Sequence, residues 1–297
     1  MRVSWAYHDN PTYRITRAMM MIRLSFQTLS LWLAALSCLL AVPAWADPIT
    51  IDMVTVGNPG NANDTGGTFN GAVNYSYQIG KYDVTIGQYT AFLNAVAATD
   101  TYSLYNASMA SDLHVAGISR TGGSGSYSYS VIDNGGDSGN RPITYVSWFD
   151  VARFANWMTN GQGGGDTETG AYTLNGATSG NAVAANPDAA FRLPTVNEWY
   201  KAAFYSPTLN SGAGGYYAYA TQSNEAPGNL IGNLPNQANY EAGGVYSVTG
   251  SDSFDPNQNY LTDVGTFSGS GSFYGTFDQS GNVFQWNDLD GTAGSLR

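Results

Sequence analysis

The chain has 297 residues, of which 22 are Asp or Glu and only 11 are Lys or Arg, so its formal net charge is −11. Nucleic acids and anionic membranes are recognised through a basic face, and this charge excludes both classes of partner. Charged residues make up 11% of the chain, while Gly (36) and Tyr (21) are frequent, which favours one loop-rich domain with many turns.

The N-terminal region predicts export. Arg23 precedes an uncharged stretch rich in Leu and Ala over residues 24–40, and residues 43–46 place small side chains where a signal peptidase reads them. We therefore expect cleavage after Ala46, a secreted or cell-surface location, and no membrane insertion after cleavage. The alternative is a retained anchor helix, but the uncharged stretch falls short of the ~20 residues that a span needs.

Domain boundaries and thiol content follow from that cleavage. Residues 1–46 are expected to be an N-terminal extension and signal peptide, and residues 47–297 a single domain. The polar residues 1–18 match neither a signal nor a core, which points to a start codon further along the chain. Cys38 is the only cysteine and lies within the predicted signal, so the domain itself has no thiol.

The first half of the domain predicts two strands, a helix and a hairpin. Residues 49–56 and 75–81 alternate apolar and polar side chains, as strands of a half-buried antiparallel sheet do. Residues 86–96 have apolar side chains at helical spacing, and Thr85 can cap that helix. The polar residues 99–140 are expected to form a surface excursion with a hairpin.

Two further helices are predicted in the second half. Ser147 can cap a helix over residues 148–158, whose apolar side chains lie on one face. Thr195 precedes a third helix over residues 196–204. Residues 206–263 follow as a mostly irregular segment rich in Tyr, and a segment of that length is uncommon in a compact domain unless it binds something.

Four segments, in a particular order and spacing, carry a family resemblance. They are Tyr82 to Tyr89, Arg141 to Trp148, Arg192 to Trp199, and Gly281 to Trp286. Together they resemble the formylglycine-generating enzymes, also called sulfatase-modifying factors, from about Ile49 to Asp288. The resemblance implies an α+β fold of the C-type-lectin-like kind, with few regular elements and long loops. It also implies, for the family, a copper-dependent oxidation of a substrate cysteine to formylglycine.

The chain departs from the family at the redox centre. The family's copper sits on a pair of cysteines, and because residues 47–297 contain none, copper is not expected on this chain. Iron-dependent relatives need histidine clusters, whereas this region has only His114, expected to be solvated. The family also continues with a closing strand beyond the point where this chain stops at Arg297. We therefore expect a truncated sheet, with an unpaired edge and a partly exposed Trp286.

The same resemblance implies calcium sites, and calcium is the one cofactor expected here. Asn239 and Tyr240 match the family's Ala-Asn-aromatic segment, and Asp255 can supply an acid from the next loop. A second set would use Asn282, although Gln285 stands where the family has an acid. Calcium takes 6–8 oxygen ligands. The alternative is that these Asn and Asp residues only form turns.

The other polar and aromatic residues singled out in these segments are expected to be structural. Arg192 and Glu198 are predicted to form an internal ion pair rather than a catalytic one, and Trp148 and Trp286 to contribute to the core.

Three functions remain open from the sequence. The first is an exported binding or structural module without oxidase activity, whose partner is an extracellular protein or a glycan. The second is an oxidase whose cysteine pair lies beyond Arg297. The third is a calcium-assisted, lectin-like glycan binder in which exposed aromatic rings stack on sugars.

Overall fold

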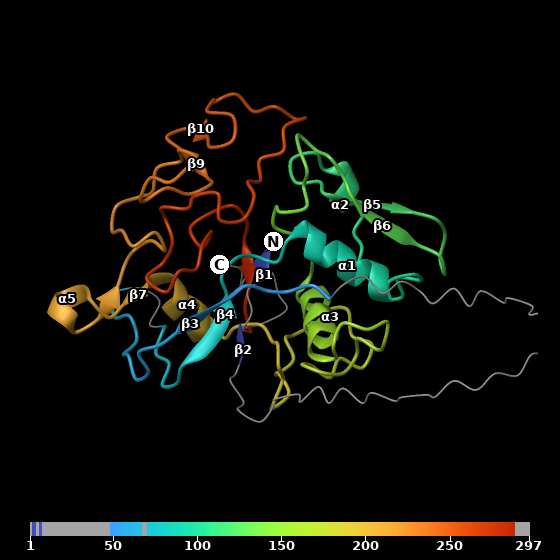
Figure 1. Cartoon of the computed structure of the whole chain (residues 1–297), viewed down its shortest axis with the longest axis horizontal. Helices are drawn as coiled ribbons and strands as arrows, with labels where there is room; N and C mark the ends of the chain where they lie inside the picture. The colour runs from blue at the N-terminus through green and yellow to red at the C-terminus, as the bar shows by residue number, and fades with distance from the viewer. Residues whose placement is uncertain (1, 4–5, 8–47, 67–69, 289–297) are drawn as a thin grey trace, which may run out of the picture. The chain divides into compact units, whose positions relative to one another are not determined.

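The computed structural model describes residues 2–3, 6–7, 48–66 and 70–288. Within these residues, short helices and short strands alternate along a chain that is largely irregular (Figure 1), a mixture that is consistent with the α+β class. No helix in the described ranges is both long and apolar enough to cross a membrane. The predicted signal segment and Cys38 lie outside these ranges.

The predicted helices are confirmed, because each begins at a local capping signal. They are α1 (Ile86–Val96), α3 (Trp148–Thr159) and α4 (Val196–Phe204). Thr85, Ser147 and Thr195 each form a capping box, in which the side-chain oxygen accepts the third helical N–H and the third side chain accepts the cap's own N–H. A cap of this kind stabilises a helix by ~1 kcal/mol. Only α3 differs from prediction, by extending one residue past Met158.

Helices α1 and α3 bury their aromatic faces against each other. The ring centroid of Phe92 lies 5.3 Å from that of Phe154 and 5.4 Å from that of Trp157. Trp148, at the start of α3, is 1% exposed and donates its indole N–H to the carbonyl oxygen of Asn287 at 3.1 Å. This bond connects the main core to the C-terminal part of the described chain.

A three-stranded sheet forms beside this core. Strand β3 (Met53–Val56) pairs antiparallel with β4 (Tyr77–Gly80), in the register Val54 to Ile79, which confirms the two predicted strands. The other edge of β4 pairs antiparallel with β2 (Ala6–Tyr7), and β1 (Arg2–Val3) pairs in parallel with β11 (Gln285–Trp286). Figure 1 shows β1 beside β11 at the centre of the domain.

The remaining elements are short. They are α2 (Ser108–Ser111), the hairpin of β5 (Ile118–Thr121) and β6 (Ser128–Val131), the hairpin of β7 (Tyr205–Ser206) and β8 (Gly215–Tyr216) with α5 (Leu209–Gly212) between them, and the hairpin of β9 (Glu241–Ala242) and β10 (Val245–Tyr246). The hairpin of β5 and β6 confirms the hairpin predicted within residues 99–140. The segment is not a surface excursion, however, because Met109, Ile118 and Tyr129 are buried in the main core.

The expected exposure of Trp286 is wrong. This residue is 4% exposed and donates its indole N–H to the carbonyl oxygen of Val146 at 3.0 Å. The physical reason is that the indole packs in the main core with Val146 and Trp148. Strand β11 also has a backbone partner, since Arg2 and Val3 pair with Gln285 and Trp286. Sequence patterns gave no indication that residues so near the N-terminus pair with the domain.

A cleft lined by tyrosines and amides

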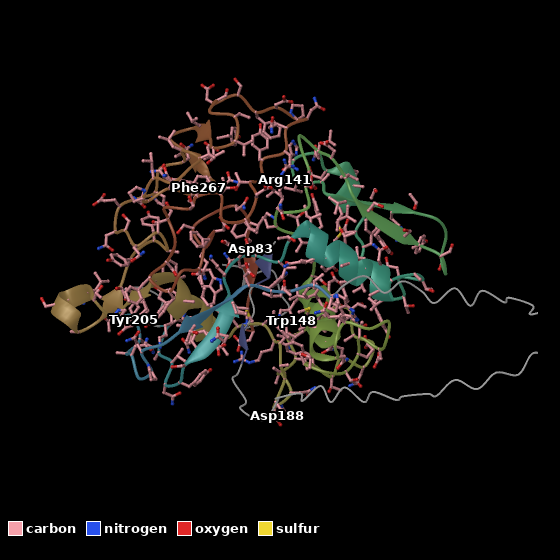
Figure 2. The ribbon with its side chains drawn as sticks, in the orientation of Figure 1. Asp83, Arg141, Trp148, Asp188, Tyr205 and Phe267 are labelled. Carbon is pink, nitrogen blue, oxygen red and sulfur yellow. The ribbon has the colours of Figure 1, made fainter. Side chains whose placement is uncertain are left out.

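Two adjoining cavities flank the loop of residues 58–65. The first has a volume of about 660 Å³ and the second about 580 Å³, and Gly60 and Asn61 line both. We call this pair of cavities the loop cleft. Figure 2 places Tyr205, which lines the first cavity, apart from Trp148 of the main core.

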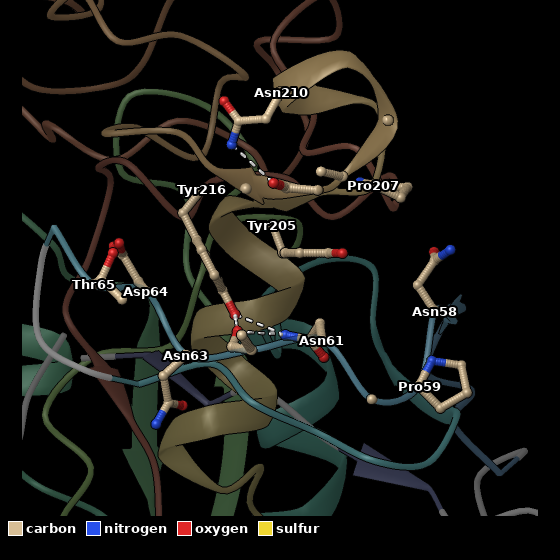
Figure 3. Close-up of a pocket in the computed structure, with 16 residues that line it drawn as sticks. Asn58, Pro59, Asn61, Asn63, Asp64, Thr65, Tyr205, Pro207, Asn210 and Tyr216 are labelled. Atoms are coloured by element: carbon tan, nitrogen blue, oxygen red, sulfur yellow. Dashed lines mark hydrogen bonds between the residues drawn. The ribbon is translucent and has the colours of Figure 1, made fainter.

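Two tyrosines from the hairpin of β7 and β8 form one wall of the first cavity (Figure 3). The rings of Tyr205 and Tyr216 meet edge to face, with centroids 5.2 Å apart. The hydroxyl of Tyr216 accepts a hydrogen bond from the Asn61 side-chain amide at 2.7 Å and donates one to the carbonyl oxygen of Ala62 at 2.8 Å. Tyr216 thereby fixes the loop against the hairpin.

Glycines allow these hydroxyls to approach the backbone. Gly214 has φ +83° and Gly71 has φ +106°, values that L side chains rarely adopt. A Cβ at Gly214 would overlap the Tyr205 hydroxyl, and one at Gly71 would overlap the Tyr216 hydroxyl. Both tyrosine side chains can therefore take these positions only because Gly214 and Gly71 have no side chain.

The rest of the first cavity is polar. Asn58, Asn63 and Asn210 line it, and Asp64 is the one ionisable acid among its described lining residues. The side-chain amide of Asn210 donates to the Gly214 carbonyl oxygen at 2.9 Å. The cleft thus combines aromatic rings with amide donors and acceptors, the groups that recognise hydroxyl-rich molecules.

A buried lysine supports the loop from below. Lys201 of α4 is fully buried, and its Nζ donates to the carbonyl oxygen of Asn58 at 2.9 Å. Because burial disfavours the charged form, the pKa of Lys201 is lowered to about 8. The hydrogen bond to Asn58 therefore links the position of the cleft loop to the protonation state of Lys201.

The predicted ion pair of Arg192 and Glu198 borders the second cavity. The guanidinium binds the carboxylate through two bonds of 2.6 and 2.8 Å, and Tyr75, which lines that cavity, donates to Glu198 at 2.9 Å. Burial would raise the pKa of Glu198, but the hydrogen bonds and charge of Arg192 lower it below its ordinary value. Glu198 also accepts the backbone N–H of Thr195 at 2.7 Å, so this pair supports the framework.

The structure brings together two of the residues predicted to bind calcium. The side-chain amide of Asn239 donates to Asn282 Oδ1 and to the carbonyl oxygen of Tyr260, both at 2.8 Å. Asn282, at φ +66°, accepts the backbone N–H of Thr262 at 3.2 Å. A calcium ion needs oxygens turned inward and usually carboxylates. Here an amide N–H₂ points at the two oxygens and no carboxylate contacts them in the described chain. The pair does not fit calcium in this arrangement.

The other two predicted ligands make separate contacts. Tyr240 donates its hydroxyl to the carbonyl oxygen of Pro227, and its N–H bonds Ser247 Oγ at 3.1 Å. Asp255 accepts the N–H of Asn257 at 2.8 Å, as in an ordinary turn. The described residues contain no group of three or more His, Cys, Asp or Glu side chains arranged for a metal.

His114, predicted to be solvated, is partly exposed and also makes contacts within the domain. Its Nδ1 lies 2.8 Å from Asp112 Oδ1, and its ring packs 4.8 Å from that of Phe254. The second oxygen of Asp112 accepts the Tyr145 hydroxyl, which lowers the pKa of Asp112. The ring of Phe254 shields only part of the imidazole, since the His114 side chain remains 34% exposed.

The residues of the loop cleft were not individually predicted. Lys201 comes from the predicted helix, Tyr205 from the position directly after it, Tyr216 from the Tyr-rich irregular segment, and Asn61 from a loop. The available signal was the unusual length of residues 206–263, which indicates binding but does not say which Tyr residues take part.

Comparison with known families supports the fold-level resemblance. The family model of the sulfatase-modifying factor enzyme 1-like domain matches residues 55–290, which is most of the chain. Searches of curated proteins and of solved structures gave no match. The matched range contains all three capped helices, the loop cleft and the asparagine pair. On this evidence, the chain belongs to the sulfatase-modifying factor enzyme 1-like domain family.

Proposed function

We propose that this domain is an exported binding module on a C-type-lectin-like framework, and that its loop cleft takes up a glycan. The observation that carries the proposal is the pairing of Tyr205 and Tyr216 with an amide-lined cavity of about 660 Å³. Sugar rings present C–H faces that pack on aromatic rings and hydroxyls that bond to amides. The predicted signal segment supports an extracellular location for this encounter.

Oxidase activity is not part of the proposal, for a chemical reason. The family's copper needs soft sulfur ligands, and residues 47–297 contain no cysteine. The three thioether sulfurs of residues 47–297 offer no replacement. Met109 and Met158 are buried at 1% and 5% exposure, and Met53 is partly buried against the same core, so no accessible pair of sulfurs is available.

A glycan array probed with the full chain tests the proposal, followed by calorimetric titration of the best ligand. Asn210→Ala and Tyr216→Phe each remove a polar group of the cleft, and we expect each to weaken binding by roughly tenfold, ~1.4 kcal/mol. Tyr145→Phe is the matched control, since it removes a hydroxyl from a tyrosine outside the cleft.

Two results would count against glycan binding in the loop cleft. One is an array without a saturable ligand, and the other is a ligand whose affinity is the same for the cleft variants and the control. A parallel titration in EDTA separates calcium-assisted binding, which the chelator abolishes, from direct binding, which it leaves unchanged.

A further inference from the structure

The walls of the loop cleft carry negative charge and no positive charge. Asp64 lines the first cavity and Asp288 the second, whereas no Lys, Arg or His is among the described residues that line either cavity. The part of the chain that supplies Tyr205 and Tyr216 has the same sign, since residues 202–288 contain seven acids and no Lys, Arg or His. A cleft lined by one sign of charge concentrates ligands of the opposite sign. The cleft therefore favours a cationic group on its ligand over an anionic one.

Both carboxylates are held in place by neutral donors. The Tyr200 hydroxyl donates to Asp64 Oδ2 at 2.7 Å, and the backbone N–H of Gly66 donates to Asp64 Oδ1 at 2.9 Å. Asp288 Oδ1 accepts the backbone N–H of Val196 at 2.9 Å. Within the described chain, neither acid forms an ion pair. Because each carboxylate oxygen has two lone pairs, both acids keep charge and acceptor capacity for a ligand.

The ammonium of Lys201 lies under the cleft loop but does not line either cavity. It is fully buried, and its Nζ donates to the carbonyl oxygens of Asn58 and Val73 at 2.9 and 3.5 Å. A ligand in the cleft therefore meets the carboxylates directly, whereas it cannot form a salt bridge with this ammonium.

The tyrosine wall suits the same kind of ligand. Tyr205 and Tyr216 line the first cavity, with their ring centroids 5.2 Å apart. The C–H face of a sugar packs on such rings, and the π electrons of the rings also attract a cation carried by the sugar. Aromatic faces, amides and uncompensated carboxylates thus occur together in one cleft.

We propose that the loop cleft selects glycans that carry a free amine, such as oligomers of glucosamine, over neutral and anionic glycans. This inference rests on the proposed function, because it names the class of glycan that the cleft takes. A sugar ring packs on the tyrosine wall, and its ammonium, which has N–H donors and no acceptor, binds Asp64. Asp288 binds a second amine of the same oligomer in the adjoining cavity. Sulfated glycans and glycans of uronic acids are repelled by both carboxylates.

Two tetrasaccharides of equal length and linkage test this selection. One is the tetramer of glucosamine and the other the tetramer of N-acetylglucosamine, which differ only at the nitrogen atoms. Each is titrated calorimetrically into the full chain at about pH 6, where an amine is protonated. We expect the glucosamine tetramer to bind at least roughly tenfold more tightly, as a charge-assisted hydrogen bond allows. The preference should decrease as salt is added, because salt screens charges that water can reach.

Variants of the two acids make the test specific. Asp64→Asn and Asp288→Asn each remove one charge but keep an oxygen for the donors already bound, and each should reduce the preference for the glucosamine tetramer by roughly threefold or more. Asp188→Asn is the matched control, since Asp188 is exposed, lines neither cavity and lies apart from Tyr205 in Figure 2. The control should keep the wild-type preference. Thermal melts verify that all three variants are folded.

The outcomes separate this inference from glycan binding itself. Equal affinity for the two tetramers, or an unchanged preference in both cleft variants, would overturn the selection for amines and leave glycan binding standing. A glucosamine tetramer that does not bind would also overturn the selection, and the glycan array then decides whether another glycan occupies the cleft. An array without any saturable ligand would overturn both proposals.

Discussion

Lys201 Nζ lies 2.9 Å from the carbonyl oxygen of Asn58, and this buried ammonium supports the loop that separates the two cavities of the cleft. Among the described residues, the ammonium donates to two backbone carbonyls, that of Asn58 and, at 3.5 Å, that of Val73. Burial therefore disfavours its charge without compensation from an acid among the described contacts. The stability of the domain and the position of the cleft loop therefore both depend on the protonation of Lys201.

The first prediction concerns alkaline pH. The pKa of Lys201 is lowered by burial to about 8 in the folded state, and an unfolded lysine titrates near 10.4. Between these values the unfolded state binds more protons, so the free energy of unfolding should rise as pH increases from about 8 to about 10. Urea midpoints measured at pH 7, 8, 9 and 10 check this, and Lys201→Met should remove most of the rise. A flat wild-type profile would contradict it.

A second prediction concerns acid pH and Asp150 in the capping box of α3. Burial raises the pKa of Asp150 to about 6, although its carboxylate accepts the Ser147 N–H at 2.7 Å. The folded state therefore binds more protons than the unfolded state between about pH 4 and pH 6, and this group's contribution to stability falls as pH rises through that window. In Asp150→Asn, which keeps an oxygen for the Ser147 N–H, the stability relative to wild type should increase from pH 4 to pH 6. Thermal melts at half-unit pH steps measure the difference, and a constant difference would refute the assignment.

The third prediction compares a buried and an exposed ion pair. Glu198→Gln leaves the Arg192 guanidinium without its carboxylate, and we expect a loss of ~3–5 kcal/mol in the free energy of unfolding. Arg120→Ala is the comparison, because Arg120 is 30% exposed in its pair with Asp100, and Asp100 keeps the backbone N–H of Leu104 as a partner when Arg120 is removed, so we expect a smaller loss than for Glu198→Gln. Chemical denaturation of both variants measures the two losses in the free energy of unfolding. Similar losses for the two would show that the buried pair is not a framework element.

The fourth prediction concerns the asparagine pair. Asn239→Ala removes the donor to Asn282 and to the Tyr260 carbonyl, which should cost ~1–3 kcal/mol because two partly buried acceptors lose their partner. The melting temperature of the wild type should be the same in calcium and in EDTA, since the amides satisfy one another. A melt that shifts upward with calcium, and no longer shifts in Asn239→Ala, would instead establish the calcium site expected from the sequence.

The fold was predictable where its causes are local. Thr85, Ser147 and Thr195 mark the starts of their helices in the sequence, because a capping box needs only residues within one turn. The cleft was not predictable, because the bond of Tyr216 to Asn61 joins residues 155 positions apart and depends on glycines that carry no pattern of their own.

The same distinction applies to the N-terminal strands and to the asparagines. The pairing of β1 with β11 spans nearly the whole chain, and no local rule links the two strands. Asn239 and Asn282 were selected together through the family resemblance, and they do meet, but the direction of an amide is set by its neighbours and cannot be read from residue type.

The capping boxes have a consequence for the order in which this domain assembles. Helix starts that depend on neighbouring residues can form early in folding, while the contact between the tyrosine hairpin and the loop of residues 58–65 must wait for distant segments to meet. We therefore expect the cleft to open before the helices on mild destabilisation, so that hydrogen exchange of the Ala62 and Tyr216 amides precedes that of Phe92 and Phe154. Ligand binding to the cleft would then be lost on mild destabilisation, before the helices unwind.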